Sequence, residues 1–306
     1  MKIYIASFSN QSKAYGNGYH QEVFYTEQLK LNNRLLSHYA ISIIRHKESM
    51  ESYNFYKEPS NPVSLFLDSG AYSAFTQNIE INIDEYIQYI KDNKDCISQY
   101  AVLDVIGDAE GTLKNQLYME ENGLNPIPCF HYGDDEMYLR EYLKRNNYIA
   151  LGGMVKRPKN QLGYWLDEIW EKYLTNRDGT AKLKIHGFGM TSVSFMKRYP
   201  WYSVDSTSWV LTGRFGCVYC DIGDYNKVAI SNKGNIENSA HYYQLGKNSQ
   251  EHIREYFINL GEGYTIEELA EDYQKRDEVN IIYFLNLEKY LTDNPPRFIQ
   301  TQTTLF

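Results

Sequence analysis

A repeated alternation of short apolar runs with amphipathic helical segments constrains this chain more than any other sequence feature. Seven runs have the length and the aromatic or β-branched content of buried strands: 3–7, 64–70, 100–107, 127–133, 148–154, 184–190 and 202–209. Helices are expected to begin at Asn82, Asp108, Asp134, Pro158, Thr191, Ser249 and Thr265. Strands that alternate with helices are typical of parallel sheets with crossover connections.

The alternation predicts an α/β fold, a (β/α)8 TIM-type barrel with additional C-terminal helices. The run at 217–222 supplies the eighth strand. A doubly wound open sheet is the alternative, but no G-x-G-x-x-G follows the first strand. We expect a single barrel domain over 1–294, with the acidic helices included, and a flexible tail over 295–306 after two prolines.

The net charge of −8 is unevenly distributed along the chain. Residues 251–294 hold eleven Asp and Glu against four Lys and Arg, whereas residues 151–200 hold nine Lys and Arg against four Asp and Glu. A basic region therefore remains for phosphates, and a nucleic-acid substrate is not excluded.

Cysteine content and hydropathy predict a cytoplasmic protein without a membrane segment. Four cysteines in 306 residues do not make a disulfide framework. The longest apolar runs, such as 281–285, are far shorter than the ~18 residues of a membrane span, and the N-terminus has no signal-peptide core.

Polar residues and glycines gather where the expected strands end. They are Asp68, Ser69, Gly70, Asp104, His131, Gly152, Gly153, His186, Gly187, Asp205 and Ser206. One aspartate at a strand end is more often a cap or turn residue, as expected for Asp108 and Asp134. Three carboxylates and two imidazoles at equivalent barrel positions indicate a catalytic site.

Five segments in order resemble the tRNA-guanine transglycosylases: LDSGAYSAF (67–75), YAVLDVIGD (100–108), ALGGMV (150–155), HGFGMT (186–191) and SVDSTSW (203–209). The resemblance covers about residues 1–230, and the last segment is most similar to the DpdA-type enzymes. This phage and bacterial branch inserts 7-deazaguanines into DNA. The resemblance implies a barrel enzyme that exchanges guanine in DNA for a free 7-deazaguanine base.

The resemblance also assigns roles to three carboxylates. Asp205 would be the nucleophile, because retention of configuration needs a covalent glycosyl intermediate. Asp68 would take a proton from the incoming base. Asp104 would read guanine by accepting hydrogen bonds from its N1–H and exocyclic amine.

Further residues are assigned to the same pocket by the resemblance. His131 stands where the tRNA enzymes have Gln, Gly152 and Gly153 would let the backbone approach the base edge, and Tyr72 would stack on the flipped base or pack. The remaining substrate-binding candidates are Ser69, Gly70, Met154, His186 and Gly187.

The zinc site of the tRNA enzymes is incomplete in this sequence. Cys217 and Cys220 align with its last two cysteines, but Phe215 replaces the first and His241 is only a loose match. Residues three apart on a strand point to opposite faces, so we expect no zinc and no other cofactor. Cys96 and Cys129 are expected to be buried structural residues.

Two groups of residues are candidates for macromolecular contacts. The basic side chains of Lys156, Arg157, Lys159 and Arg214 follow strand ends, where they would contact DNA phosphates unless they are only a solvated face. The C-terminal QTTLF resembles the peptide by which replication proteins bind the bacterial sliding clamp. Its anchors would be Gln302, Leu305 and Phe306, unless the last two fold back on the barrel.

Three alternatives to the DNA enzyme stay open. One is a tRNA-guanine transglycosylase, against which the incomplete zinc motif counts. Another is a non-catalytic barrel that binds deazapurines or nucleic acid, which would not require both Asp68 and Asp205. A nucleoside hydrolase is the third, although no calcium-binding aspartate cluster is recognisable in the sequence.

Overall fold

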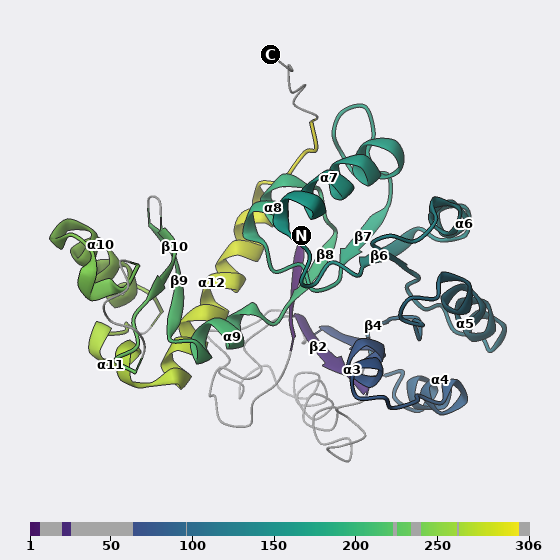
Figure 1. The fold of residues 1–306 in the computed structure, drawn as a ribbon, viewed down its shortest axis with the longest axis horizontal. Coiled ribbons are helices and arrows are strands. Elements are labelled where there is room, and N and C mark those ends of the chain that lie inside the picture. Colours follow the sequence, from purple (N-terminus) through teal and green to yellow (C-terminus); the bar gives the residue numbers. More distant parts are fainter. Residues whose placement is uncertain are drawn as a thin grey trace. The chain divides into compact units, whose positions relative to one another are not determined.

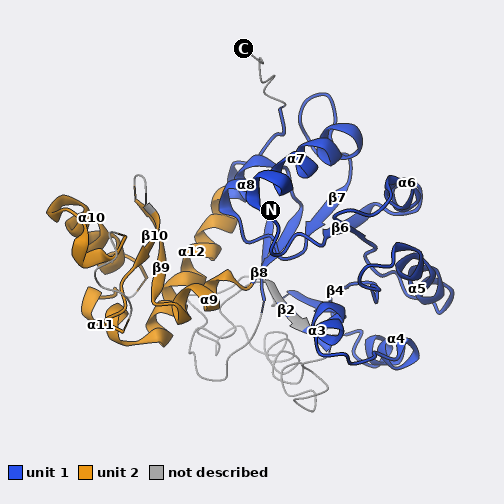
Figure 2. Cartoon of the chain, in the orientation of Figure 1, with its two compact units in different colours: residues 1–6, 19–206, 291–306 blue, residues 7–18, 207–290 orange. Residues whose placement is uncertain are grey.

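The computed structural model describes residues 1–6, 20–25, 64–95, 97–222, 225–233, 240–261 and 263–299. The chain divides into two compact units (Figure 2). Unit 1 comprises residues 1–6, 19–206 and 291–306, and unit 2 comprises residues 7–18 and 207–290. The domain predicted over 1–294 thus contains both units, the second being inserted after the last strand of the first.

Unit 1 is a mixed α/β structure built on a parallel eight-stranded sheet (Figure 1). Its strands are β1 (Lys2–Ile5), β2 (His20–Phe24), β3 (Ser64–Asp68), β4 (Gln99–Tyr100), β5 (Cys129–His131), β6 (Tyr148–Gly152), β7 (Lys184–Gly187) and β8 (Ser203–Ser206). The spatial order is β4-β3-β2-β1-β8-β7-β6-β5, and every pairing in it is parallel. The α/β class predicted from the alternation is confirmed.

The two terminal strands of this order, β4 and β5, are also connected through the residues that flank them. Ala101 and Ile127 form a parallel bridge. The Ile127 amide donates to the Tyr100 carbonyl at 3.0 Å, and the Val102 amide donates to the Ile127 carbonyl at 3.1 Å. Backbone hydrogen bonds therefore join the segments at the two ends of the strand order.

One predicted strand takes a different place, and one strand is unpredicted. The run 217–222 forms β9 (Cys217–Ile222), but it pairs antiparallel with β10 (Tyr225–Ala229) in a separate two-stranded sheet. The eighth parallel strand is instead β2, whose sequence HQEVF is too polar to stand out as a buried strand. The assignment of 217–222 to the parallel sheet was wrong.

The helices of unit 1 follow the predicted pattern closely. They are α3 (Ala71–Thr76), α4 (Ile83–Asp92), α5 (Ala109–Glu121), α6 (Glu136–Arg145), α7 (Lys159–Ile169), a π-helical turn (Trp170–Leu174) and α8 (Val193–Arg198). The side chains of Asn82 and Asp108 cap α4 and α5 as predicted. The cap of α6 is Asp135 rather than Asp134, which faces His131 instead.

Unit 2 contains the β9-β10 hairpin and the acidic C-terminal helices. These are α9 (Ser208–Arg214), a 3-10 turn (Tyr242–Gln244), α10 (Lys247–Ile258), α11 (Ile266–Glu271) and most of α12 (Tyr273–Asp293). The predicted capping box of Thr265 and Glu268 is present in α11. Buried Asn280 of α12 accepts from the Tyr219 amide at 2.7 Å and donates to the Trp209 carbonyl at 3.0 Å, which attaches the helix to the hairpin and to α9.

The chain stays attached to unit 1 beyond the two prolines at 295 and 296. Phe298 is buried, and its amide donates to the Gly179 carbonyl at 2.9 Å. The segment predicted as a free tail from residue 295 is therefore anchored at Phe298, because this aromatic side chain packs against Tyr199. Gln302, Leu305 and Phe306 lie outside the described residues, as does Cys96.

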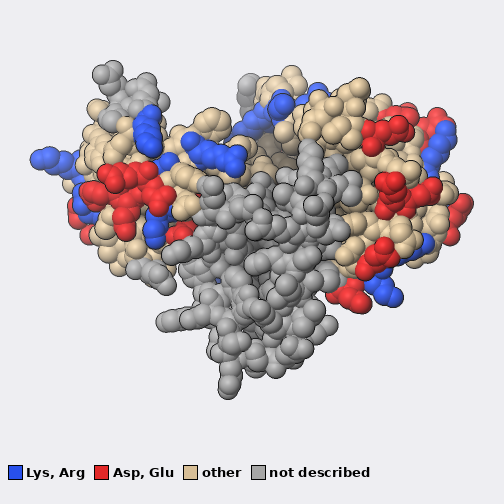
Figure 3. Space-filling model, turned by 90° about the horizontal axis from the view of Figure 1, so that it is seen from below, with Lys and Arg blue, Asp and Glu red and all other residues tan. Residues whose placement is uncertain are grey.

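On the face seen in Figure 3, basic and acidic side chains are present on both units. Within the described ranges, no helix has the length and apolar character needed to cross a membrane.

Candidate active site

The register of the parallel strands brings the polar residues of unit 1 onto one face of the sheet. Directly paired residues of parallel strands point to the same side, and the side alternates along each strand. Applied through the observed pairings, this rule places one set of residues together: Tyr4, Glu22, Phe66, Asp68, Cys129, His131, Ala150, Gly152, His186, Ser203 and Asp205. The acidic and imidazole members cluster toward the carboxyl ends of their strands.

Two groups lie against the Asp205 carboxylate at the end of β8. One belongs to β7 and the other to the residues that follow it. Its Oδ1 accepts the backbone N–H of Gly189 at 2.7 Å, and the His186 Nε2 lies 3.3 Å from the same oxygen. Gly189 has a φ of 61°, which glycine adopts without strain. One carboxylate oxygen is thus fixed in place.

The His186 ring is fully buried and oriented from its other side. Its Nδ1 lies 2.8 Å from the Ser203 hydroxyl, which in turn lies 2.6 Å from the Tyr148 hydroxyl. The ring stacks on Phe66 at a centroid distance of 4.9 Å, and Phe188 contacts it edge-on at 4.5 Å. This packing directs Nε2 toward Asp205, although the contact is too poorly aligned to count as a hydrogen bond.

Asp68, at the end of β3, has an unusual protonation equilibrium. Its Oδ1 accepts the Gly70 N–H at 2.6 Å, and the φ of 72° at Gly70 permits this tight turn. Burial, followed by the neighbouring Asp104 and Asp205 carboxylates, raises the pKa of Asp68 to about 7. A carboxyl group with this pKa can exchange protons near neutral pH.

Asp104 and His131 form an ion pair next to Asp68. The His131 Nε2 lies 3.0 Å from Asp104 Oδ2, while the Ser69 hydroxyl donates to Asp104 Oδ1 at 3.1 Å. Asp134 approaches the His131 Nδ1 at 3.5 Å and accepts its backbone N–H at 3.0 Å. Burial opposes a charged imidazole, but Cys129, Asp104 and Asp134 together raise the pKa of His131 above its ordinary value. The raised pKa favours the charged form of the His131 imidazole beside these two carboxylates.

Glu22 of β2 is a site residue that the motifs did not reveal. Its side chain is only 2% exposed, and neither of its carboxyl oxygens has a hydrogen-bond donor in the described part of the chain. Burial first, and then Asp205 and Asp68, raise its pKa well above the ordinary range. In the sequence, Glu22 is a single glutamate between Gln21 and Val23. This pattern does not distinguish a buried strand from a loop.

Gly152 is required by the packing of the site itself. A Cβ atom there would lie 2.7 Å from the Cys129 Sγ and 2.9 Å from the His131 Cδ2. Its neighbour Gly153 has a φ of 69°, which favours glycine. The absence of a side chain at Gly152 thus makes room for His131, a role in addition to the predicted approach of backbone to a base.

We expect Gly152→Ala to displace His131 from Asp104 and to destabilise the fold by about 1–3 kcal/mol, the usual effect of overpacking a core. Urea denaturation measures the second effect, and the His131 imidazole resonance measures the first through a lowered pKa. Gly163→Ala in α7 is the control, because its Cβ would meet Phe195 only at ordinary distances of 3.5 and 3.6 Å. Equal stability of the two variants would show that the space at Gly152 is not needed.

Basic and aromatic side chains lie beside this cluster on α3 and on the segment that follows β6. Tyr72 is half-exposed, and the Lys156 Nζ lies 3.3 Å from its hydroxyl. The Arg157 guanidinium lies over the Tyr132 ring at 4.7 Å, and the Lys159 ammonium lies 5.8 Å from the Phe195 ring centroid. Exposed cations next to an exposed aromatic ring such as that of Tyr72 are suited to contacts with nucleic acid.

The remaining predicted residues take other positions. Met154 is buried, and a Cβ at Gly187 would lie 3.1 Å from the Trp201 ring and 3.2 Å from the Met190 Cβ, so both positions belong to the core. Arg214 is an exposed residue of α9 and belongs to unit 2, whereas the other three basic candidates belong to unit 1.

The zinc candidates belong to the β9-β10 hairpin and its surroundings. Cys217 is half-buried and Cys220 is fully buried. The His241 ring nitrogens are engaged, Nε2 with the Ser231 carbonyl at 3.3 Å and Nδ1 with the Tyr243 amide at 3.3 Å. Across the described ranges, no group of three or more Asp, Glu, His and Cys side chains has the arrangement of a metal site.

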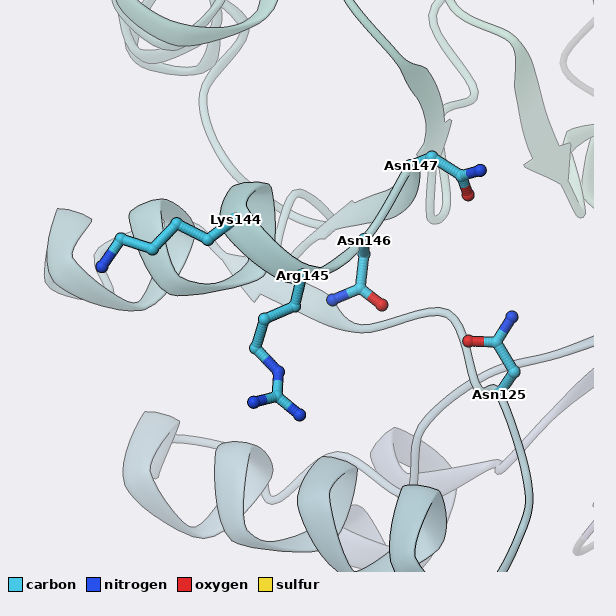
Figure 4. A pocket seen from close by; sticks show the side chains of 5 residues that line it. All are labelled: Asn125, Lys144, Arg145, Asn146 and Asn147. Atoms are coloured by element: carbon cyan, nitrogen blue, oxygen red, sulfur yellow. The ribbon is translucent and has the colours of Figure 1, made fainter.

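A polar depression of about 470 Å³ lies elsewhere in unit 1 (Figure 4). It is lined by Asn125, Lys144, Arg145, Asn146 and Asn147. These residues precede β5 and β6, so the depression is at the amino ends of the strands, opposite the carboxylate cluster. Its arginine is already paired with Glu120.

No protein-family model matches the chain, and no curated protein does.

Proposed function

We propose that this chain is a base-exchange glycosyltransferase that replaces guanine in DNA by a 7-deazaguanine through a covalent intermediate on Asp205. The observation that carries the proposal is the convergence of Asp68, Asp104 and Asp205 at the carboxyl ends of parallel strands. Two of these carboxylates suit a retaining exchange, in which one acts as the nucleophile and the other moves a proton.

The fold that accompanies this function would be a closed (β/α)8 barrel. The strand order β4-β3-β2-β1-β8-β7-β6-β5 is the order of such a barrel, and the Ala101–Ile127 bridge supports closure between its two ends. The alternation of side-chain direction is consistent through every strand pairing of the sheet and through the Ala101–Ile127 bridge. In this architecture the carboxylate cluster occupies the catalytic end.

The exchange would proceed in two balanced steps. In the first, a carboxylate oxygen of Asp205 forms a bond to C1′ of the nucleotide while the bond from C1′ to guanine N9 breaks. Its electron pair leaves with guanine, which takes a proton from Asp68. In the second, Asp68 takes a proton from N9–H of the incoming deazaguanine, whose nitrogen bonds to C1′ as the ester to Asp205 breaks. The Gly189 N–H on Oδ1 orients Asp205 and leaves Oδ2 for the attack.

Asp104 would hold the base in both steps. Its two oxygens already accept from Ser69 and His131, and each carboxylate oxygen can accept a second hydrogen bond. His131 lies beside it, and a carboxylate suits a group that accepts from the N1–H and amine of guanine. Adenine lacks this pair of donors.

The direct test is to express the protein with a supply of deazaguanine, to digest the cellular DNA, and to identify its nucleosides by mass spectrometry. Deazaguanosine deoxynucleosides in DNA support the proposal. Their appearance in tRNA alone would replace it by the tRNA reaction, and their absence from both, with purified enzyme also inactive, would refute it.

Charge reversal of Lys156 and Arg157 to Glu should weaken DNA binding and flatten its salt dependence. Each lost phosphate contact lowers the slope of log affinity against log salt by about one. Fluorescence anisotropy at several salt concentrations measures the slope. Lys94→Glu is the matched control, since this exposed lysine follows α4 at the amino ends of the strands. An unchanged slope in the double variant would place the DNA path elsewhere.

The C-terminal QTTLF remains a proposed docking peptide for the sliding clamp. Deletion of residues 302–306 should abolish clamp binding in a surface-plasmon assay and leave base exchange on short oligonucleotides unaltered. The chain is anchored to unit 1 at Phe298, shortly before this peptide begins in the sequence. Equal clamp binding with and without the peptide, or none in either case, would contradict the assignment.

A further inference from the structure

Glu22 stands out among the buried ionisable groups of unit 1, because no motif and no step of the exchange accounts for it. It lies in the middle of β2, paired with Phe66, and its side chain points to the same face as Asp68 and Asp205. It is 2% exposed, and its two oxygens have no hydrogen-bond donor from the described residues. A carboxylate in such a position would be a buried charge without a partner, which is strongly unfavourable.

The immediate neighbours of Glu22 make a negative charge there still less favourable. The strand register puts Glu22 on the same face as Asp68 of β3 and Asp205 of β8, and after burial these two carboxyl groups are the causes that raise its pKa. The other ionisable groups nearby are Asp104 and Tyr86 beyond Asp68, and His186 beyond Asp205. Two carboxyl groups can contact each other favourably only if one of them carries a proton, which its O–H then donates to the other.

We propose that Glu22 is a positioning residue that carries a proton and donates its single O–H to the carboxylate of Asp68, beside Asp205. The role rests on the proposed base exchange, since it concerns the same two aspartates. Glu22 would thus hold the two aspartates side by side without adding a third negative charge. Its hydrogen bond favours the ionised form of Asp68, against the burial that raises the pKa of that residue.

Two substitutions separate a neutral donor from a charged neighbour. Glu22→Met has a similar length but neither a donor nor a charge, whereas Glu22→Gln is neutral and keeps an N–H donor. If Glu22 is protonated, Met removes a hydrogen bond from a carboxylate and makes the aspartate easier to protonate. If Glu22 is ionised, Met removes a negative charge and makes the aspartate harder to protonate. The two readings therefore predict shifts of opposite sign.

The experiment is a carboxyl-¹³C NMR titration of the full-length protein labelled at Asp, with Asp68→Asn and Asp205→Asn used to assign the two resonances. We expect the midpoint of the Asp68 titration to move to higher pH in Glu22→Met. The proton concentration at this midpoint should be about tenfold lower than in the wild type. In Glu22→Gln it should stay near the wild-type position. A shift to lower pH in either variant, or no shift in Glu22→Met, would overturn the proposal.

Two further measurements address the proton itself. Infrared spectra of the wild type at pH 8.5 should contain a protonated-carboxyl band that disappears in Glu22→Gln, and its absence would overturn the proposal even if Glu22→Met does not fold. Calorimetry with Ca²⁺ and Mg²⁺ should show no binding that depends on Glu22, because binding lost in Glu22→Gln would identify an ionised ligand.

The titration and the spectra do not require catalysis, so they remain decisive if the wild type exchanges no base. In that case the proposed function fails and the protonated contact is judged on its own. If exchange occurs, its rate should fall on the acid side of the pH profile at a higher pH in Glu22→Met than in Glu22→Gln. Coincident acid limbs would show that Glu22 does not position the reacting aspartates.

Discussion

Replacement of Asp205 by Ala should abolish base exchange, with a loss in rate of at least about 10⁴-fold, as expected when a covalent nucleophile is removed. Asp205 lies at the end of β8 with one oxygen fixed by the Gly189 N–H. A denaturing gel of enzyme with guanine-containing DNA should show a covalent adduct for the wild type and none for the variant.

Asp205→Asn provides the matched variant for this experiment. Its amide oxygen can still accept the Gly189 N–H, so the local structure is retained while the nucleophilic oxygen is lost. Asp108→Asn, at the cap of α5, is the control for a general effect of removing a carboxylate. An adduct of undiminished yield with either Asp205 variant would remove this residue from the nucleophilic role.

Replacement of Asp68 by Asn should slow exchange by about 10²–10⁴-fold, the usual contribution of a general acid or base. The same variant should be more stable than the wild type at pH 8. The pKa of Asp68 is raised from 3.8 to about 7 in the folded protein, so folding favours its protonated form. The stability that this group contributes is complete below about pH 4 and is lost as the pH rises through about 7.

The side chain in Asp68→Asn does not titrate, so this variant does not lose stability as the pH rises. At pH 8 its free energy of unfolding should exceed that of the wild type by up to about 4 kcal/mol, the equivalent of a pKa change from 3.8 to about 7. At pH 4 the two curves should converge. Urea denaturation at the two pH values measures this difference, and a variant less stable than the wild type at pH 8 would contradict the raised pKa.

The strands and helices with a clear period could be predicted from the sequence, because local pattern determines them. Seven of the parallel strands and the caps at Asn82 and Asp108 follow from composition and spacing. The choice between Asp134 and Asp135 as the cap of α6 does not, since both can cap and only tertiary structure supplies His131 as a partner for Asp134.

The failures have a common physical origin in tertiary context. The run 217–222 has strand character, but its pattern does not state which sheet it joins, and its nearest partner in sequence completes a hairpin. β2 lacks the usual alternation of a strand because Glu22, rather than an apolar residue, occupies its buried position. Local rules fail most often where a chain carries functional groups, and here the missed strand and the missed site residue are the same segment.

The candidate site was predictable as a set of strand ends but not as a network. The motifs place Asp68, Asp104, His131 and Asp205 at equivalent strand positions. They do not reveal that Gly152 makes room for His131, because this depends on atoms of β5 that are far away in sequence. Which carboxyl groups share a proton likewise depends on burial and distance, neither of which a motif records.

The insertion of unit 2 after β8 has a consequence for how such a chain can diversify. Asp205 lies two residues before the unit boundary, and the chain returns to unit 1 at Leu291, next to Thr292, which exchanges hydrogen bonds with Met1 at 3.2 and 3.0 Å. Every carboxyl group of the proposed site is therefore encoded outside the inserted 84 residues, 207–290. Recombination within this stretch would alter unit 2 and leave the carboxyl cluster of unit 1 unchanged.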